Sequence, residues 1–329
     1  MKKYAIVLAA GKGTRMRSEC PKVLHTIQGK PMITRVLEAI DQAEISNKYV
    51  VVGHGADQVE KVLDDSVKIV LQEQQLGTGH AVREALNVLK DDVDSFADTT
   101  VLITCGDTPL LRAESLSDML AQHISQGNVA TVMTTIVDDP TGYGRILHDG
   151  KSILGIVEEK DASLNEKEIQ EINVGTYCFS LEFLISKINE LDTNNAQGEF
   201  YLTDLLKMAY EAGKPTAAFV LNDANESLGV NNRLKLARAE MLFIKRVNEK
   251  WMLQGISMKD PSSMYIEDDV VLEPDVFLEA NVHLFGHTHI KRNAVIESGS
   301  RITDSIIGEN VIVKQSVIKD SVVGAYTTI

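Results

Sequence analysis

The sequence predicts an α/β domain with a doubly wound, mostly parallel sheet, followed by a parallel β-helix of hexapeptide repeats. Three observations predict this order of folds. Short apolar strands alternate with amphipathic helices over about the first 230 residues, one long helical pattern follows, and apolar residues then recur at every sixth position. The 329 residues leave room for about two domains of ordinary size.

The first domain is expected over residues 1–229. Its strand candidates lie at residues 4–10, 49–53, 67–71, 101–105 and 129–137, with helical patterns between them at 32–43, 56–63, 79–89 and 114–125. Later strands are expected at 153–158 and 173–180, and later helices at 181–191 and 201–212. Such alternation is typical of a parallel sheet whose ligand binds at the carboxyl ends of the strands.

A linker helix is expected over residues 230–252 and part of a β-helix over residues 253–329. One set with a period of six contains Val270, Val276, Val282, Thr288, Ala294, Ser300 and Ile306, and a second contains Leu272, Leu278, Leu284, Ile290, Ile296 and Ile302. Residues two apart on a strand face the same side, so each repeat supplies one short strand with two inward side chains. After Ile302 the phase slips by one residue, and the apolar set resumes as Val311, Val317 and Val323.

A glycine-rich turn follows the first strand. Residues 8–16 read Leu-Ala-Ala-Gly-Lys-Gly-Thr-Arg-Met. Glycine has no Cβ, so its backbone N–H groups can approach a phosphate closely. Four cations crowd this turn, namely Lys12, Arg15, Arg17 and Lys22. This density favours a site for several phosphates over a plain anion-binding turn.

Two familiar phosphate-binding loops do not fit this turn. The dinucleotide-binding fingerprint requires a third glycine where Met16 stands. A Walker A loop requires Gly-Lys-Ser/Thr at a spacing that neither Gly11 nor Gly13 begins. An ordinary strand–turn–helix with solvated lysines remains the alternative interpretation.

Composition restricts the classes of partner. The net charge is −14 and there is no basic tail or stripe, so nucleic acid is not an expected partner. The three cysteines are scattered without a Cys-x-x-Cys spacing, which argues against a disulfide framework or a zinc site. No segment approaches the run of about 20 apolar residues that a membrane span needs, and the short apolar run at the start lacks a cleavage site. We therefore expect a cytoplasmic enzyme that does not insert into a membrane.

A set of short motifs identifies a family that the chain resembles. These motifs lie at residues 8–16, 21–25, 75–81, 106–110, 140–146, 155–158, 171–175, 194–199 and 229–232. With the long helix and the hexapeptide repeats, they resemble the bacterial bifunctional UDP-N-acetylglucosamine pyrophosphorylase/glucosamine-1-phosphate N-acetyltransferases over essentially the whole chain. The resemblance implies a domain of the nucleotide-diphospho-sugar transferase type and a left-handed β-helix. Cys105 departs from the pattern, since many members carry an aromatic residue there.

The resemblance implies transfer of UMP from UTP to N-acetylglucosamine 1-phosphate, giving UDP-N-acetylglucosamine and pyrophosphate for cell-wall synthesis. A sugar phosphate oxygen attacks the α-phosphorus, so the protein must offset the repulsion between two anions. The backbone expected to cradle the nucleotide belongs to Leu8, Ala9, Ala10, Gly11 and Gly13. We expect Arg15 to hold the β- and γ-phosphates, and Lys22 to reach the α-phosphate and the sugar phosphate.

Asp107 and Asn231 are the expected ligands of Mg²⁺. Asp107 follows a predicted strand, and Asn231 lies in a Gly-Val-Asn-Asn run. Mg²⁺ prefers oxygen ligands and commonly takes one or two from the protein and the others from phosphates and water. Both residues also have structural interpretations, Asp107 as a helix cap and Asn231 as the cap of the helix that follows it.

Separate residues are assigned to the base and to the sugar. The amide of Gln72 can match a pyrimidine edge, and a flat ring can lie on the backbone of Gly77 and Thr78. On the sugar side, the resemblance points to Gly144, Glu158 and Asn173. Structural roles are expected for His25, His54 and His80, which lack metal-ligand spacing.

Two other functions compete with this hypothesis. A sister pyrophosphorylase would use glucose 1-phosphate or mannose 1-phosphate with another nucleoside triphosphate, and Gln72 and residues 142–144 argue against it. A non-catalytic regulatory subunit of the same architecture would be free to lose the charged residues, yet all four are present: Arg15, Lys22, Asp107 and Asn231.

The resemblance also implies a homotrimer that associates through the β-helix. In the family, the acetyltransferase site lies on later coils than those of this chain. The chain stops at Ile329 without the capping segment that solenoid ends normally have. We therefore expect a shortened form without this second site.

Overall fold

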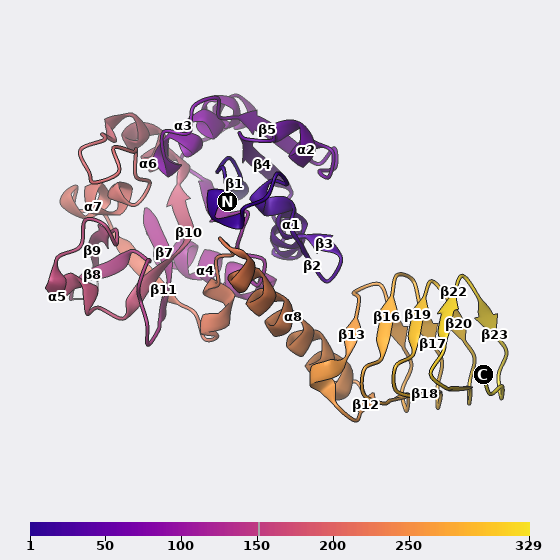
Figure 1. Ribbon diagram of the computed structural model, residues 1–329. Helices are drawn as coiled ribbons and strands as arrows, with labels where there is room; N and C mark the ends of the chain where they lie inside the picture. Colours follow the sequence, from indigo (N-terminus) through magenta and orange to yellow (C-terminus); the bar gives the residue numbers. More distant parts are fainter. Residues whose placement is uncertain (151) are drawn as a thin grey trace. The chain divides into compact units, whose positions relative to one another are not determined.

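The computed structural model describes residues 1–150 and 152–329, which form two compact units (Figure 1). The first unit comprises residues 1–25 and 31–236, and the second comprises residues 26–30 and 237–329. The first contains a mixed α/β sheet and the second a parallel β-helix. The fold class predicted from the sequence is therefore confirmed.

A nine-stranded sheet forms the centre of the first unit. Its strands are β1 (Lys2–Leu8), β4 (Asn47–Val52), β5 (Val67–Leu71), β6 (Thr99–Cys105), β7 (Ala130–Ile136), β8 (Arg145–Asp149), β9 (Ser152–Val157), β10 (Glu171–Ser180) and β11 (Thr216–Val220). The main path runs β11-β7-β10-β6-β1-β4-β5, with β8 and β9 beside β10. β1 is parallel to β4 and β6, and β4 is parallel to β5, whereas β10 is antiparallel to β6 and β7. The carboxyl ends of four parallel strands therefore meet at one edge.

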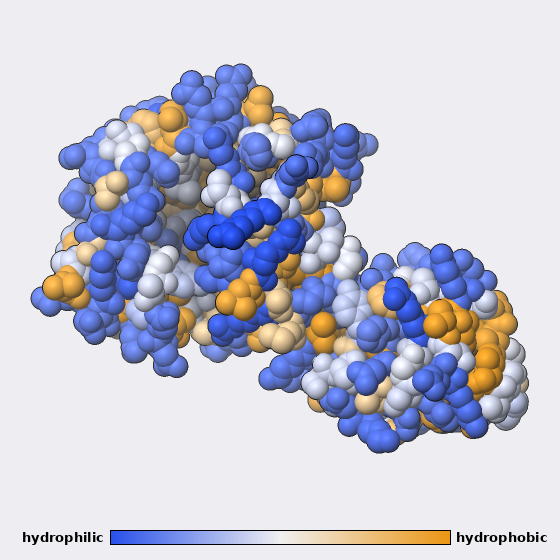
Figure 2. Space-filling view, viewed as in Figure 1, coloured by the Kyte–Doolittle hydropathy of each residue, from blue (hydrophilic) through white to orange (hydrophobic). Residues whose placement is uncertain are grey.

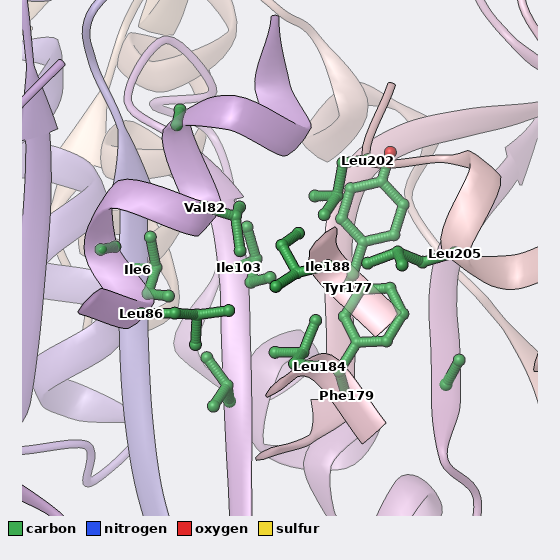
Figure 3. Close-up of a cluster of buried hydrophobic side chains, with 14 of the residues drawn as sticks. Ile6, Val82, Leu86, Ile103, Tyr177, Phe179, Leu184, Ile188, Leu202 and Leu205 are labelled. Atoms are coloured by element: carbon green, nitrogen blue, oxygen red, sulfur yellow. The ribbon is translucent and has the colours of Figure 1, made fainter. Parts of the chain in front are cut away.

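Helices cover both faces of this sheet. They are α1 (Met32–Gln42), α2 (Ala56–Glu60), α3 (Thr78–Leu89), α4 (Ala113–Ser125), α5 (Leu164–Lys167), α6 (Leu181–Lys187) and α7 (Asp204–Glu211). Successive side chains of a strand point to opposite faces, so Ile6 enters one apolar core and its neighbour Val7 enters the other. Figure 3 shows the first core, in which Val82 and Leu86 of α3 lie near Ile6.

Short elements complete the first unit and the start of the second. The 3₁₀ helices are η1 (Thr14–Met16), η2 (Lys22–Leu24), η3 (Lys90–Asp92), η4 (Ile188–Glu190), η5 (Ala224–Ser227) and η6 (Pro261–Ser263), and a two-stranded pair joins β2 (Thr26–Ile27) to β3 (Lys30–Pro31).

The predicted elements are present, and several of their ends differ. The strand predicted at 4–10 ends at Leu8, because Ala9 already begins the turn. The helix predicted at 181–191 ends at Lys187 and continues as η4, and the helix predicted at 201–212 begins only at Asp204. Strands β8 and β11 are not predicted, since their short mixed sequences, RILHD and TAAFV, show little alternation of polar and apolar residues.

The second unit consists of three parallel sheets of four strands. α8 (Arg233–Leu253) precedes β12 (Ser257–Met258), β13 (Tyr265–Ile266), β14 (Val271–Leu272), β15 (Phe277–Leu278), β16 (His283–Phe285), β17 (His289–Ile290), β18 (Val295–Ile296), β19 (Arg301–Thr303), β20 (Ile306–Ile307), β21 (Ile312–Val313), β22 (Val317–Lys319) and β23 (Val322–Val323). Each strand pairs with the third strand after it, so three strands make one coil. Leu278, Leu284 and Ile290 are fully buried inside the coils, as the period of six predicts.

The predicted phase is wrong at two positions near the end of the β-helix. His283 pairs with Arg301, eighteen residues on, but His289 pairs with Ile306 and Arg301 pairs with Val317, after only seventeen and sixteen residues. Ile306 likewise pairs with Val322 after sixteen residues, so three turns are shortened by one residue, those before β20, β22 and β23, whereas the sequence pattern indicates one slip. Side chains of a strand alternate between the two faces. Each shortened turn therefore moves the inward position by one residue relative to the period of six.

As a result, Ile306 and Val317 are not core residues. Ile306 is 40% exposed and Val317 is 80% exposed, whereas Ile307 and Ile318 are 0% and 8% exposed. The apolar core residues after Ile302 are therefore Ile307, Val311, Val313, Ile318 and Val323, so Val311 and Val323 of the predicted set are confirmed as buried.

We expect Ile307→Ala and Ile306→Ala to separate inward from outward positions. Loss of the buried side chain leaves a cavity and should cost about 2–5 kcal/mol of stability, whereas the exposed neighbour should change stability by about 0.5 kcal/mol or less. Urea denaturation followed by circular dichroism measures both variants. Equal losses would show that the first shortened turn, between β19 and β20, is placed wrongly.

Candidate active site

The glycine-rich turn begins at the end of β1, between the ends of β4 and β6. Ala9 donates its backbone N–H to the carbonyl of Val51 in β4 at 2.8 Å. Gly106, directly after β6, donates its N–H to the carbonyl of Leu8 at 2.9 Å. The residues that follow β6, which include Asp107, are therefore held beside the turn.

Gly13 allows Lys22 to lie against the turn. The φ angle of Gly13 is +58°, and a Cβ at this position would lie only 2.7 Å from the Cβ of Lys22. Any other residue would displace Lys22, so glycine is required here by both conformation and space. The ammonium group of Lys22 forms an ion pair with Asp107, and the two side chains are only 20% and 15% exposed.

The other cations of the turn extend into solvent. Lys12 and Arg15 are exposed, and no carboxylate among the described residues pairs with either of them. In a chain with a net charge of −14, exposed cations without a carboxylate partner create a local positive field that attracts anions. Arg15 lies on η1, and no contact among the described residues ties its side chain to Lys22.

Asn231 is brought to Asp107 from the other end of the first unit. The backbone N–H of Val230 donates to the backbone carbonyl oxygen of Asp107 at 2.8 Å, so the segment that carries Asn231 is held against the backbone of Asp107. On the other side, the hydroxyl of Thr108 donates to the Cys105 carbonyl at 2.8 Å and shapes the turn. The backbone of Asp107 and the segment of Asn231 therefore lie close together.

The structural alternatives for these two residues do not apply. The helix after Asp107 is α4, whose N-cap residue is Arg112. The first turn of α8 is capped by Asn232, whose Oδ1 accepts from the N–H of Lys235 at 2.8 Å, and not by Asn231. Neither Asp107 nor Asn231 is therefore used as a helix cap.

The residues expected to bind the sugar come together from the ends of two strands and from a third strand. Gly144 precedes β8, Glu158 follows β9, and Asn173 lies in β10. The N–H of Asn173 donates to the Gly144 carbonyl at 2.9 Å. A Cβ on Gly144 would lie 3.4 Å from both carboxylate oxygens of Glu158. Burial raises the pKa of Glu158, although a hydrogen bond from the Thr203 hydroxyl at 3.3 Å acts in the opposite direction.

The side chain of Asn173 is held at both of its ends. Its Nδ2 donates to the hydroxyl of Tyr177 at 2.7 Å, and its Oδ1 accepts from the N–H of Gly175 at 2.9 Å. The ring of Tyr177 packs in the first core beside Phe179 (Figure 3). The amide is thus oriented by a residue that the sequence analysis does not identify.

An ion pair between a buried arginine and a partly exposed carboxylate also supports this region. Arg145 is 1% exposed and lies 2.8 Å from the carboxylate of Glu159, which in turn accepts from the N–H of Gly142 at 3.1 Å. Arg145 also donates to the carbonyl of Tyr143. Together these contacts hold the segment that leads into Gly144. The only signal in the sequence is an arginine next to a glycine-rich segment, which does not reveal burial.

A third group of residues lies after the end of β5 and at the start of α3. It consists of Gln72, Gly77 and Thr78. Nε2 of Gln72 donates to the Gly77 carbonyl at 3.2 Å, and the Gln72 side chain is 3% exposed. The hydroxyl of Thr78 accepts from the N–H of Leu202 at 3.1 Å, so this side chain anchors the loop after α6. No contact among the described residues joins this group directly to the Lys22–Asp107 pair.

Cys105 is held as a neutral thiol. Burial raises its pKa to about 12. The thiol donates weakly to the carbonyl of Gly175 at 3.8 Å, between β6 and β10. Cys105 therefore packs between strands, where many members of the family it resembles have an aromatic ring.

We expect Glu158→Gln and Glu159→Gln to change stability in opposite directions. The pKa of Glu158 is raised in the folded protein, so its carboxylate destabilises the fold as the pH rises through that pKa. Glu158→Gln should therefore raise Tm at pH 8. Below the unfolded-state pKa it should have little effect, because the carboxyl group is then protonated in both states. The hydrogen bond from Gly142 and the Arg145 guanidinium lower the pKa of Glu159, so its contribution is present at pH 8 and is lost in acid. Thermal unfolding at pH 4 and pH 8 measures both variants, and a lower Tm of Glu158→Gln at pH 8 would contradict the burial argument.

The chain is similar to known proteins over nearly its whole length. Residues 4–252 match the nucleotidyl transferase family. The chain is 47% identical over 322 residues to the bifunctional protein GlmU of Streptococcus mutans, covering 98% of this chain and 69% of that protein. It is 46% identical to the bifunctional protein GlmU of Streptococcus equi subsp. zooepidemicus, covering 100% of this chain and 71% of that protein. The corresponding protein of Enterococcus faecalis is 45% identical, with 98% and 69% covered.

The described residues contain no helix that is long and apolar enough to cross a membrane.

The strand-end turn with its cations, the matched family and the extent of the identity all lead to one assignment. The chain belongs to the nucleotidyl transferase family and, within it, to the bifunctional GlmU proteins.

Proposed function

We propose that the first unit transfers UMP from UTP to N-acetylglucosamine 1-phosphate and releases pyrophosphate. The observation that carries this proposal is the ion pair of Lys22 with Asp107 beside the glycine-rich turn, with the segment of Asn231 hydrogen-bonded to the backbone of Asp107. A cation and a carboxylate at one location, with an amide on the adjoining segment, suit a reaction in which phosphates of two substrates meet. The similarity to GlmU proteins supports the same reaction.

In this reaction, an oxygen of the sugar phosphate forms a bond to the α-phosphorus of UTP. The bond between the α-phosphorus and the oxygen that bridges to the β-phosphate breaks, and its electron pair leaves with pyrophosphate. The sugar phosphate is already ionised, so no general base is needed. Lys22 exchanges its contact with Asp107 for the phosphates and offsets the charge of the two anions, while exposed Arg15 holds the β- and γ-phosphates.

Asp107 and Asn231 are suited to hold a Mg²⁺ ion. Their donors are oxygens, and the Asp107 carboxylate already binds a cation, the ammonium group of Lys22. Among the described residues there is no group of three His, Cys, Asp or Glu side chains that could hold a metal, so the other ligands would come from phosphates and water, as is usual for Mg²⁺. When bound, the ion would neutralise negative charge on the phosphates.

The group of Gly144, Glu158 and Asn173 is proposed to bind the sugar. The carboxylate of Glu158 can accept hydrogen bonds from hydroxyl groups. Because Gly144 has no side chain, its backbone can lie close to this carboxylate: a Cβ there would be 2.8 Å from the side chain of Ile156 and 3.4 Å from both carboxylate oxygens. The held amide of Asn173 retains one N–H and one lone pair for a hydroxyl or acetamido group.

Purified protein should release pyrophosphate from UTP and N-acetylglucosamine 1-phosphate, and EDTA should abolish the release. A coupled pyrophosphate assay measures it, with glucose 1-phosphate and mannose 1-phosphate as parallel substrates. Equal rates with either of these sugars would favour a sister pyrophosphorylase. No release from any pair would favour the regulatory subunit.

Within this assay, Lys22→Ala should lower kcat by about 10²–10³, the usual effect of losing one oriented charge in a transition state. Lys61→Ala, which removes an exposed lysine of the same unit, is the matched control. A near-normal kcat of Lys22→Ala would remove this residue from the mechanism.

We further propose that the β-helix forms a homotrimer through the sheet of β14, β17, β20 and β23. Its outer face carries Val271, Ile306 and Val322, which are 49%, 40% and 77% exposed. Figure 2 shows hydrophobic surface gathered on the second unit. His289, which pairs with Glu273, lies between Val271 and Ile306 in this sheet. Exposed apolar side chains on neighbouring strands are typical of an interaction surface.

Ile306→Lys combined with Val322→Lys should convert the trimer to monomers, because two charges would be buried at the interface. Val317→Lys is the control, since Val317 is 80% exposed but lies on a different sheet. Size-exclusion chromatography with light scattering measures the mass. A monomeric parent protein, or a trimer that survives the double substitution, would contradict the proposed interface.

A further inference from the structure

A chain of polar side chains runs from Gln72 through His80 to Glu84. Gln72 follows β5, and His80 and Glu84 lie one turn apart on α3. Nε2 of the Gln72 amide lies 3.2 Å from the carbonyl oxygen of Gly77 and 2.9 Å from Nδ1 of His80. The carboxylate of Glu84 lies 3.2 Å from the other ring nitrogen of His80.

The carbonyl of Gly77 determines which end of the Gln72 amide faces it. A carbonyl oxygen only accepts hydrogen bonds, so the amide atom beside it has to be nitrogen. With the amide reversed, two carbonyl oxygens would face each other at 3.2 Å. Gly77 itself has little freedom to turn, because its φ is +112° and a Cβ on it would lie 2.6 Å from the carbonyl oxygen of Phe200.

The same reasoning determines the proton position on His80. The second N–H of the amide points to Nδ1 of His80, so Nδ1 accepts and the neutral ring carries its proton on Nε2. The negative charge of Glu84 favours a proton on that nitrogen. The ring is 9% exposed and stacks on Phe200 with a centroid distance of 6.4 Å, so it cannot easily turn over.

Both hydrogens of the Gln72 amide are therefore used, and its oxygen remains. No group in residues 1–150 and 152–329 donates a hydrogen bond to Oε1 of Gln72. Oε1 of Gln72 is also not among the buried polar atoms that lack a partner, so it can be reached by water or by a ligand that supplies a donor.

The surroundings of Gln72 adjoin the nucleotide turn. Nε2 of Gln75 donates to the backbone carbonyl of Gln72 at 3.0 Å. A Cβ on Gly53 would lie 2.8 Å from Nε2 of Gln75 and 2.9 Å from the carbonyl oxygen of Ala10, so the two segments are separated by little more than the width of a glycine. A ligand held by the turn can therefore reach the amide.

We infer that His80 and Glu84 are positioning residues that make Gln72 a hydrogen-bond acceptor for the base, so that the site selects a pyrimidine with a donor at N3. Uracil presents N3–H at the middle of its edge, whereas cytosine presents a lone pair there, which would face the lone pairs of Oε1. The inference rests on the proposed function, because it requires that the base of the nucleotide binds beside Gln72. It gives His80 more than the structural role that the sequence predicts.

The test compares His80→Phe with His80→Asn. Phenylalanine keeps the ring stacked on Phe200 but removes the acceptor, whereas the Oδ1 of asparagine can occupy the position of Nδ1. His80→Phe should raise KM for UTP about tenfold and lower the preference for UTP over CTP in kcat/KM about tenfold, with kcat little changed, because the freed amide can turn. His80→Asn and Glu84→Gln, which retain acceptors, should keep a preference near that of the parent protein.

The outcomes separate this inference from the proposed function. A folded His80→Phe variant with an unchanged preference for UTP over CTP would overturn the inference. Failure of the parent protein to use UTP at all would instead contradict the proposed function. The Tm of each variant shows whether a loss of its activity comes from unfolding.

A second measurement requires no turnover. Two-bond ¹H–¹⁵N spectra distinguish the tautomers of the eight histidines, and the signals of His80 are those absent from His80→Asn. We expect a neutral ring with its proton on Nε2. A proton on Nδ1 would overturn the inference, even if His80→Phe does not fold.

Discussion

The parallel pairing of β1 with both β4 and β6 is the constraint on which the first unit depends. Leu8 is in register with Val51 on one side and with Cys105 on the other. The three strands therefore end together, and the turns that follow them carry the glycine-rich segment and Asp107. A slip of one residue would exchange the two faces of β1 and move Ile6 and Val7 into each other's core. The register that fills both cores thus also aligns the site.

Each part of the site has a polar side chain that a neighbour holds in place before any ligand arrives. Lys22 is held by Asp107, Asn173 by Tyr177, and Gln72 by the Gly77 carbonyl. Groups that are already oriented lose little freedom when a substrate binds and can act at once on its charge. The partners come from the packed parts of the sheet, so the stability of the core and the geometry of the site are linked.

The β-helix follows a simpler rule, because every coil repeats the contacts of the one before it. Leu278 stacks next to Ile296, and Ile296 next to Val313, along one sheet. This rule tolerates shortened turns, since a coil of sixteen residues still brings Ile318 beside Ile302. What changes is the identity of the outward residue, and this change leaves Ile306 and Val317 in solvent.

Local patterns in the sequence determined the order of elements, the two-part architecture and the glycine-rich turn, because periodicity and turn chemistry depend on neighbours a few residues apart. They also singled out Lys22, Asp107, Gln72 and Glu158 by their place after strands or within motifs. They did not show that Asn232 rather than Asn231 caps α8, that Arg145 is buried against Glu159, or that Ile307 rather than Ile306 points inward. Only the tertiary structure decided these points. Each depends on a contact between distant segments or on the length of a turn, and side-chain direction reverses with a change of a single residue in a strand.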